Sequence, residues 1–378
     1  MSNGPRKVMV LGAGDIGRRV FHELAQSAAP RHVRLAGRDE EVVLRAANLA
    51  RFCALQRGFA PAVDHAVTDV TDTARTAGTI AAFDPDVLFL AVSYQSWWVI
   101  STLPDENFRR LYAANYGPWL PMHLVPVMKA MEAVRLSGTR AVIANAAYPD
   151  AVHPALSAIG LSPDIGIGNV ANNVPGIQAA AADRLGCGPE EIEVRLVAHH
   201  YVSHRLSRAG DSGPAEMGLA VLRDGRDVTA ELDVPGLLRR LPVDYRRTGG
   251  LGGHAMTAAS ALSVLEPLVD GRDALVHAPG PDGLTGGYPV ALEAGTIRLR
   301  LPGGMTPEEA HAVNVSGQEA DGIAEIRPDG TTVFGDAAMK ILTEELGYAC
   351  VELPLHEAED RARELAGRFA AYRDRTAR

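Results

Sequence analysis

Cysteine, lysine and long apolar runs are all scarce in this chain. Three cysteines are spread over 378 residues without any C-x-x-C pair, which excludes a disulfide framework and leaves no cysteine-based zinc site. Only three lysines occur, so arginine carries nearly all of the positive charge. No apolar run reaches membrane-spanning length, and the first residues lack the apolar stretch of a signal peptide. We therefore expect a cytoplasmic protein without a membrane partner.

An excess of positive charge is also missing. The formal net charge is -9, which argues against binding to nucleic acid or to an anionic membrane surface. Hydrophobic residues make up 47% and charged residues 22% of the chain, as in ordinary globular proteins. A length of 378 residues exceeds one ordinary core and favours two packed domains.

The most informative segment is residues 7–17, which read KVMVLGAGDIG. Four apolar residues break into G-x-G-x-x-G, and an amphipathic run follows. Gly12 permits a tight turn, Gly14 removes the Cβ that would block a diphosphate, and Gly17 lets helix and strand pack closely. The helix N-terminus then offers N–H groups to phosphates. The segment predicts a dinucleotide site; the alternative is a glycine-rich turn without a ligand.

The alternation of apolar runs and helical patterns in residues 1–150 predicts an α/β fold with a doubly wound parallel Rossmann sheet. Its expected strands after the first are residues 32–36, 62–67, 87–92 and 141–144, and its clearest helical stretches are 41–55 and 107–134. Residues 151–378 read as a mixed α+β domain for substrate binding and oligomerisation, which predicts a homo-oligomer. Its expected strands are 193–202, 219–223 and 296–301, and its expected helices are 176–185, 257–268, 307–313 and 356–372.

The end of the second expected strand bears on the choice of cofactor. NAD sites place an acidic residue there, but this chain has Gly37 followed by Arg38. A guanidinium can pair with a 2′-phosphate, so we expect NADP, with NAD possible because arginine can also lie over an adenine ring. Asp69 is either an adenine contact or an exposed turn residue. The expected cofactor-binding residues are Gly12, Gly14, Asp15, Ile16, Gly17, Arg38, Asp69 and Ser93.

Four short motifs follow in order along the chain. They are RLYAAN at 110–115, NAAYPD at 145–150, GNVANNVP at 168–175 and a His-His pair at 199–200. In order and spacing the chain resembles the superfamily of the lactate/malate dehydrogenases and their relatives, the NAD-dependent family-four glycosidases. The resemblance covers residues 7–205.

The resemblance implies roles for particular residues. His200 stands where the dehydrogenases have their acid/base histidine, and Asn115 and Asn145 would orient substrate or the nicotinamide carboxamide. The aspartate that pairs with this histidine is replaced by Asn172-Asn173, and the mobile-loop arginines are missing from residues 93–98 (SYQSWW). The same Asn172 replaces a metal-ligating cysteine of the glycosidases, so we expect no metal. The expected substrate-binding residues are Asn173, His199, Tyr94 and His254.

These features predict an NAD(P)-dependent dehydrogenase or reductase that moves a hydride between nicotinamide and a small polar substrate such as a hydroxy or keto acid. Alternation along the expected strand 193–202 puts His200 and His204 on one face, where a histidine can exchange a proton with the substrate. A structural histidine in the interdomain cleft is the alternative. Trp97 and Trp98 suggest a substrate more apolar than malate. Other open functions are a saccharopine- or opine-type reductase of amino acids or imines, a glycosidase-like enzyme using transient oxidation, and a dinucleotide sensor.

Overall fold

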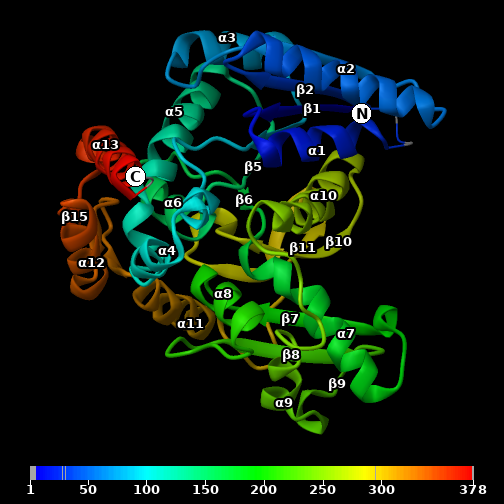
Figure 1. Cartoon of the computed structure of the whole chain (residues 1–378). Helices are drawn as coiled ribbons and strands as arrows, with labels where there is room; N and C mark the ends of the chain where they lie inside the picture. The colour runs from blue at the N-terminus through cyan, green and yellow to red at the C-terminus, as the bar shows by residue number, and fades with distance from the viewer. Residues whose placement is uncertain (1–5, 28, 30, 294, 377–378) are drawn as a thin grey trace.

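A six-stranded parallel sheet forms the centre of the computed structural model, which describes residues 6–27, 29, 31–293 and 295–376 (Figure 1). The strands lie in the order β3-β2-β1-β4-β5-β6, and every neighbouring pair is parallel. Their bounds are β1 Arg6–Leu11, β2 Arg31–Gly37, β3 Ala62–Val67, β4 Val87–Leu90, β5 Val142–Asn145 and β6 Ile165–Gly166. The predicted doubly wound sheet is confirmed, and its sixth strand lies beyond residue 150.

Both faces of this sheet are covered because β1 is apolar on both sides. Val8 and Val10 pack into one core, while Met9 and Leu11 pack into another, as alternating side chains of a strand must. The first core is covered by α1 Asp15–Ala25, α2 Glu40–Gln56 and α10 His254–Asp270. The second is covered by α3 Thr73–Phe83 and α5 Pro121–Ser137. Burial on both faces explains the unbroken apolar run that predicted β1.

The end of the chain returns to the N-terminal half (Figure 1). Helices α12 (Asp336–Leu346) and α13 (Ala358–Thr376) join the core that contains Met9, and the rings of Trp119 and Phe369 lie 5.4 Å apart. Residue 150, the expected domain boundary, falls inside α6 (Pro149–Ser157). Two of the three cores thus contain residues from both halves of the chain, while the third lies entirely within residues 170–241.

The remaining strands form three small antiparallel sheets, which confirms the expected mixed α/β second half. They are β7 Ile192–Val197 with β8 Gly218–Arg223 and β9 Arg226–Asp227, β10 Ala274–Pro279 with β11 Gly287–Glu293 and β12 Thr296–Leu299, and β13 Ile323–Ile326 with β14 Thr332–Phe334 and β15 Glu352–Leu353. The helices between them are α7 Val174–Leu185, α8 His200–Arg208, α9 Val234–Arg239 and α11 Pro307–Ala320. A short helix, α4 Asp105–Tyr112, precedes α5 in the first half.

The predicted strand 193–202 is wrong in its last residues. β7 ends at Val197, and α8 begins at His200 after His199, whose Nδ1 accepts a hydrogen bond from the N–H of Tyr201 at 3.3 Å. The apolar run looked like one strand, but Asp150 from a distant segment accepts the His200 N–H at 2.8 Å and stabilises a helix start. His200 and His204 still share a face because helical neighbours lie four residues apart. Their shared face was predicted correctly for the wrong reason.

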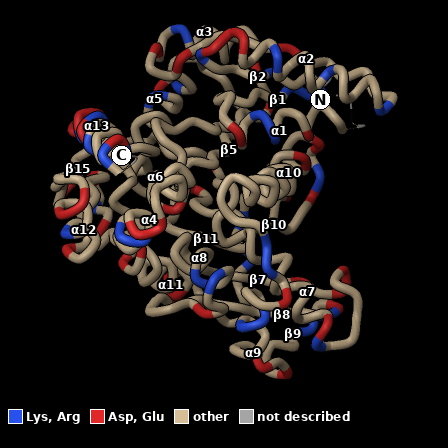
Figure 2. The backbone as a smooth tube through the Cα atoms, in the orientation of Figure 1, with Lys and Arg blue, Asp and Glu red and all other residues tan. Residues whose placement is uncertain are grey.

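Charged side chains of both signs lie along the outer helices α2 and α13 (Figure 2). Several are paired one helical turn apart, as Arg45 is with Glu41 and Arg363 with Glu359. In the part of the chain that the structure describes, no helix combines the length and the apolar character needed to cross a membrane.

Candidate active site

A continuous groove runs along the carboxyl ends of the parallel strands. It joins a pocket of about 440 Å³ beside β1 and β2 to a pocket of about 350 Å³ that reaches α8. The two pockets share Gly14, Ala91, Val92, Ser93 and Ser96. Open α/β sheets bind their ligands at this edge.

The opening glycine turn fits a diphosphate. Gly12 has φ +115°, and a Cβ there would lie 2.3 Å from the carbonyl oxygen of Ala91, while a Cβ on Gly17 would lie 1.9 Å from the oxygen of Gly12. Gly14 is different: it caps α1, and no surrounding atom lies within 4 Å of its Cβ position. Two glycines are therefore required by packing, while the third leaves space in front of the free N–H groups of the first turn of α1.

Arg38 and Asp69 line the pocket beside β2 and β3, together with Tyr94. The N–H of Thr71 and the nearby charge of Arg38 hold the pKa of Asp69 below its usual value. Asp39 caps α2, where its Oδ1 accepts the N–H of Val42 at 3.0 Å. The last residue of β2 is Gly37, so no carboxylate stands there to bind a ribose hydroxyl. Tyr94, expected near the substrate, lines this pocket and not the one at α8.

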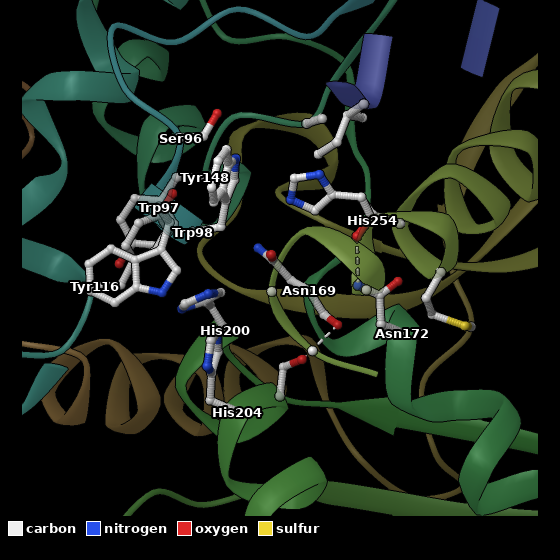
Figure 3. A pocket seen from close by; sticks show the side chains of 18 of the residues that line it. Ser96, Trp97, Trp98, Tyr116, Tyr148, Asn169, Asn172, His200, His204 and His254 are labelled. Carbon is white, nitrogen blue, oxygen red and sulfur yellow. Dashed lines mark hydrogen bonds between the residues drawn. The ribbon is translucent and has the colours of Figure 1, made fainter. Parts of the chain in front are cut away.

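His200 lies at the base of the α8 pocket (Figure 3). It is 5% exposed, and its Nδ1 lies 2.9 Å from Oδ2 of Asp321. Because Nδ1 is bonded to the carboxylate, Nε2 is the nitrogen that the ring can offer to a ligand. Burial alone would lower the pKa of His200, but the charge and hydrogen bond of Asp321 raise it above its usual value.

Asp321 is the residue that sequence reasoning missed. The resemblance implied that Asn172-Asn173 replaces the histidine's partner aspartate, but the structure brings a partner from the end of α11, 121 residues after His200. Its Oδ2 also accepts the hydroxyl of Tyr148 at 2.8 Å, and its Oδ1 accepts the N–H of Tyr116 at 3.1 Å. Burial would raise its pKa, yet His200 and these hydrogen bonds hold the pKa low. No local motif around Asp321 could have identified it.

An aromatic wall stands on one side of His200. Figure 3 shows Trp97, Trp98 and Tyr116 on this side of the pocket, with Asn169, Asn172 and His254 on the other. The ring of Tyr116 lies 4.7 Å from that of His200. His204, one turn further along α8, accepts or donates a hydrogen bond with the hydroxyl of Tyr112 at 3.0 Å, and burial lowers its pKa to about 3. His204 is therefore neutral, whereas His200 can carry a proton.

Besides Gly17, four residues of the expected site line neither pocket. Asn145 is buried, and its amide bonds to Ala147 and His153; the amide of Asn115 donates to the carbonyl oxygen of Ala320 at 3.0 Å. Asn173 donates to Oγ of Ser203 at 2.8 Å, and His199 is fully buried at the start of α8. Their side chains hold the loops behind the site, while the neighbouring Asn169 and Asn172 face the cavity.

His254 lies where we expected a substrate ligand, but its contact is with the glycine turn. Its Nδ1 is 2.8 Å from Oδ2 of Asp15 in the first turn of α1, and Arg19 bonds the same carboxylate at 2.7 Å. Burial would raise the pKa of Asp15, but both partners lower it. This pair joins α10 to the cofactor end of the groove.

Two arginines line the pocket although none was expected there. Arg208 ends α8, and its guanidinium lies 4.3 Å over the ring of Tyr112. Arg247 is held by neutral groups, the carbonyl of Asn172 and the Oδ1 of Asn173 at 2.9 Å. Among the described contacts, neither guanidinium is paired with a carboxylate. Within the described ranges no cluster of three histidine, cysteine or carboxylate side chains is placed to hold a metal ion.

By sequence, the chain matches no known protein family and no curated protein. By structure it is similar to malate dehydrogenase of Cryptosporidium parvum, with a TM-score of 0.58 and 14% identity over 83% of this chain and 96% of that one. It is similar to the lactate dehydrogenase of the same organism in complex with lactic acid and nicotinamide adenine dinucleotide, with a TM-score of 0.57 and 16% identity over 85% and 97%. Malate dehydrogenase of Picrophilus torridus gives 0.54 and 13% over 97% and 99%. The chain has the fold of lactate and malate dehydrogenases, as its motifs predicted.

Proposed function

We propose that this protein is an NADP(H)-dependent oxidoreductase that interconverts a 2-hydroxy acid and a 2-oxo acid. The observation that carries the proposal is the His200–Asp321 pair, which lies at one end of a groove whose other end is a turn shaped for a diphosphate. The similar dehydrogenases of Cryptosporidium parvum and Eimeria maxima contain lactic acid with nicotinamide adenine dinucleotide and oxamate with NADH, respectively. Those proteins thus bind a 2-hydroxy acid or a similar small acid together with a nicotinamide cofactor, which are the ligand classes proposed here.

The residues of the glycine turn would hold the cofactor diphosphate against the first turn of α1. A bound nicotinamide supplies hydride transfer. His200 then gives a proton from Nε2 to the carbonyl oxygen during reduction and takes one from the hydroxyl during oxidation. Asp321 fixes the tautomer and orientation of the imidazole and stabilises its protonated form, which explains the raised pKa of His200.

Arg247 would hold the substrate's carboxylate. Guanidinium groups bind carboxylates through paired N–H donors, and the described hydrogen-bond partners of Arg247 are neutral oxygens of Asn172 and Asn173. The expectation of a substrate more apolar than malate stays a prediction, and Arg247 supplies a cation that residues 93–98 lack.

The preference for NADP rests on Arg38. Its side chain is exposed and lines the pocket beside β2, where Gly37 offers no carboxylate to a ribose. A 2′-phosphate next to Arg38 would gain a charge-assisted pair, which a free 2′-hydroxyl cannot form. The neighbouring Asp69 opposes the phosphate in part, so we expect a preference for NADP and not an absolute selection.

A substrate panel tests the reaction class. Purified protein is mixed with NADPH or NADH and with 2-oxo acids, with amino acids plus their oxo partners, or with glycosides, and cofactor absorbance is followed. We expect net cofactor oxidation with 2-oxo acids alone. Turnover that depends on an added amine, or glycoside cleavage without net cofactor oxidation, would contradict the proposal. Association into a homo-oligomer stays a prediction, which light scattering on the same material checks.

A further inference from the structure

Aromatic side chains are rare in this chain but gather at the candidate active site. They make up 5% of the residues, and yet two of the three tryptophans line the α8 pocket. The wall also contains Phe108, Tyr112 and Tyr116. A substrate bound against His200 therefore has a surface of aromatic rings on one side.

Most of these rings pack against one another. Trp97 lies 4.7 Å from Tyr116 and 5.8 Å from Trp119, and Tyr112 lies 5.3 Å from Phe108. The guanidinium of Arg208 also lies over the ring of Tyr112. These contacts fix the wall as a rigid unit and leave its members little room to stack on a ligand.

Trp98 is the exception. Among the described residues no ring or cation stacks on its indole, although it is half-buried and lines the pocket. Its backbone is fixed, since its carbonyl oxygen accepts the hydroxyl of Ser101 at 2.6 Å in the short helix η1 (Trp97–Thr102). Figure 3 places Trp98 beside Trp97, across the pocket from Asn169 and His254. An unstacked indole that lines a cavity offers its face to a flat apolar group.

The alternatives fit this wall less well. A methyl side chain, as in pyruvate, would leave the indole in water and gain little burial. A second carboxylate, as in oxaloacetate, would lie against apolar rings unless it reached Arg208, which is two helical turns or about 12 Å along α8 from His200. A planar ring of six or nine atoms covers the indole and needs no further charge.

We propose that the substrate carries an aromatic group that stacks on Trp98, so that the enzyme reduces aromatic 2-oxo acids to their 2-hydroxy acids. This inference rests on the proposed function. In the step, the carbonyl carbon gains a hydride and its oxygen gains a proton from His200; the 2-oxo acid is reduced while NADPH is oxidised to NADP⁺. Trp98 acts on specificity and takes no part in the transfer.

The test compares phenylpyruvate, pyruvate and oxaloacetate as substrates of the full chain with NADPH. We expect kcat/KM for phenylpyruvate to exceed that for pyruvate by about tenfold or more, as stacking and ring burial together allow. Trp98→Ala should lower this ratio about tenfold, and Trp98→Phe should keep most of it. Phe52→Ala, on the exposed face of α2 at 61% exposure, is the matched control and should leave the ratio unchanged.

A preference for pyruvate or oxaloacetate, or a ratio that Trp98→Ala leaves unchanged, overturns the inference but not the proposed function. Calorimetric titration of the NADP⁺-loaded protein with phenyllactate and lactate separates the remaining outcomes. If phenyllactate binds through Trp98 but no 2-oxo acid is reduced, the aromatic site stands and the reaction class is wrong. If no 2-oxo acid is reduced and neither hydroxy acid binds, both proposals fail.

Discussion

The two ends of the groove each carry a histidine paired with an aspartate, but they are built differently. At the cofactor end, His254 and Asp15 are 2.8 Å apart with side chains 15% and 26% exposed; at the base, His200 and Asp321 are 2.9 Å apart with side chains 7% and 3% exposed. The two pairs have nearly equal distances but different burial, so their electrostatic interactions differ in strength. Water screens the first pair, whereas the second lies where an unpaired charge is costly and where a proton equilibrium can be shifted.

The largest effect should come from Asp321→Asn. The change removes the charge that raises the pKa of His200, so the imidazole loses both its orientation and its readiness to hold a proton. We expect kcat to fall by about three orders of magnitude, within the range for loss of general acid–base catalysis. Steady-state kinetics with a 2-oxo acid and NADPH measures it.

Asp15→Asn is the matched change at the exposed pair and should cost less than about tenfold in the same assay, since screened pairs contribute little. Comparable losses in the two variants would remove the distinction between the ends of the groove.

Gly14→Val should weaken NADPH binding by about a hundredfold, or close to 3 kcal/mol. The side chain would fill the space that the turn leaves for a diphosphate, but its Cβ would have no surrounding protein atom within 4 Å, so the variant should still fold. Calorimetric titration and thermal unfolding measure the two properties separately. Gly78→Val, at another open glycine in α3, is the control; if it weakened binding as much, the turn would have no special role.

Arg38→Ala should weaken NADPH binding by about ten- to a hundredfold while changing NADH binding less than threefold, because a hydrogen bond to a charged group contributes roughly 1.5–3 kcal/mol. Comparing the two cofactors tests whether Arg38 at the cofactor end of the groove selects NADPH over NADH. Parallel titrations with both cofactors measure the two affinities, and an equal loss for both would exclude a phosphate contact.

Tyr148→Phe should give the smallest effect, a shift in pH dependence. Tyr148 shares Oδ2 of Asp321 with His200, so without the tyrosine hydroxyl the carboxylate acts more strongly on the imidazole. The pKa of His200, already raised by Asp321, should therefore rise further. Reduction needs the protonated imidazole and declines as pH rises through this pKa; the decline should move to higher pH in the variant. A shift to lower pH would show that Tyr148 acts otherwise.

The cofactor end could be predicted from the sequence, whereas most of the catalytic end could not. Gly12, Gly14 and Gly17 lie within six residues, and their spacing between a strand and a helix is a local pattern that can be read from the sequence. The strand at 62–67 was predicted with its observed bounds for a similar reason. Local pattern also misled, because the apolar run 193–202 continues past the point where Asp150 starts α8.

The catalytic end depends on contacts between distant segments. His200 was found through its motif, but Asp321, Tyr148 and Arg247 reach it from other elements of the fold, and only tertiary packing brings them together. Asn145 and Asn115 occupy motif positions, yet their amides are bonded to the backbone of their surroundings. A motif indicates which segment is near the chemistry, but it does not determine which side chain faces the cavity.

The most direct test of the account is the reduction of a 2-oxo acid by NADPH in the wild-type protein and in His200→Gln, with NADPH affinity measured alongside. We predict turnover in the wild type and its loss by about three orders of magnitude in the variant, with an unchanged dissociation constant for NADPH. Undiminished turnover in His200→Gln would contradict the central claim that the buried pair moves the proton.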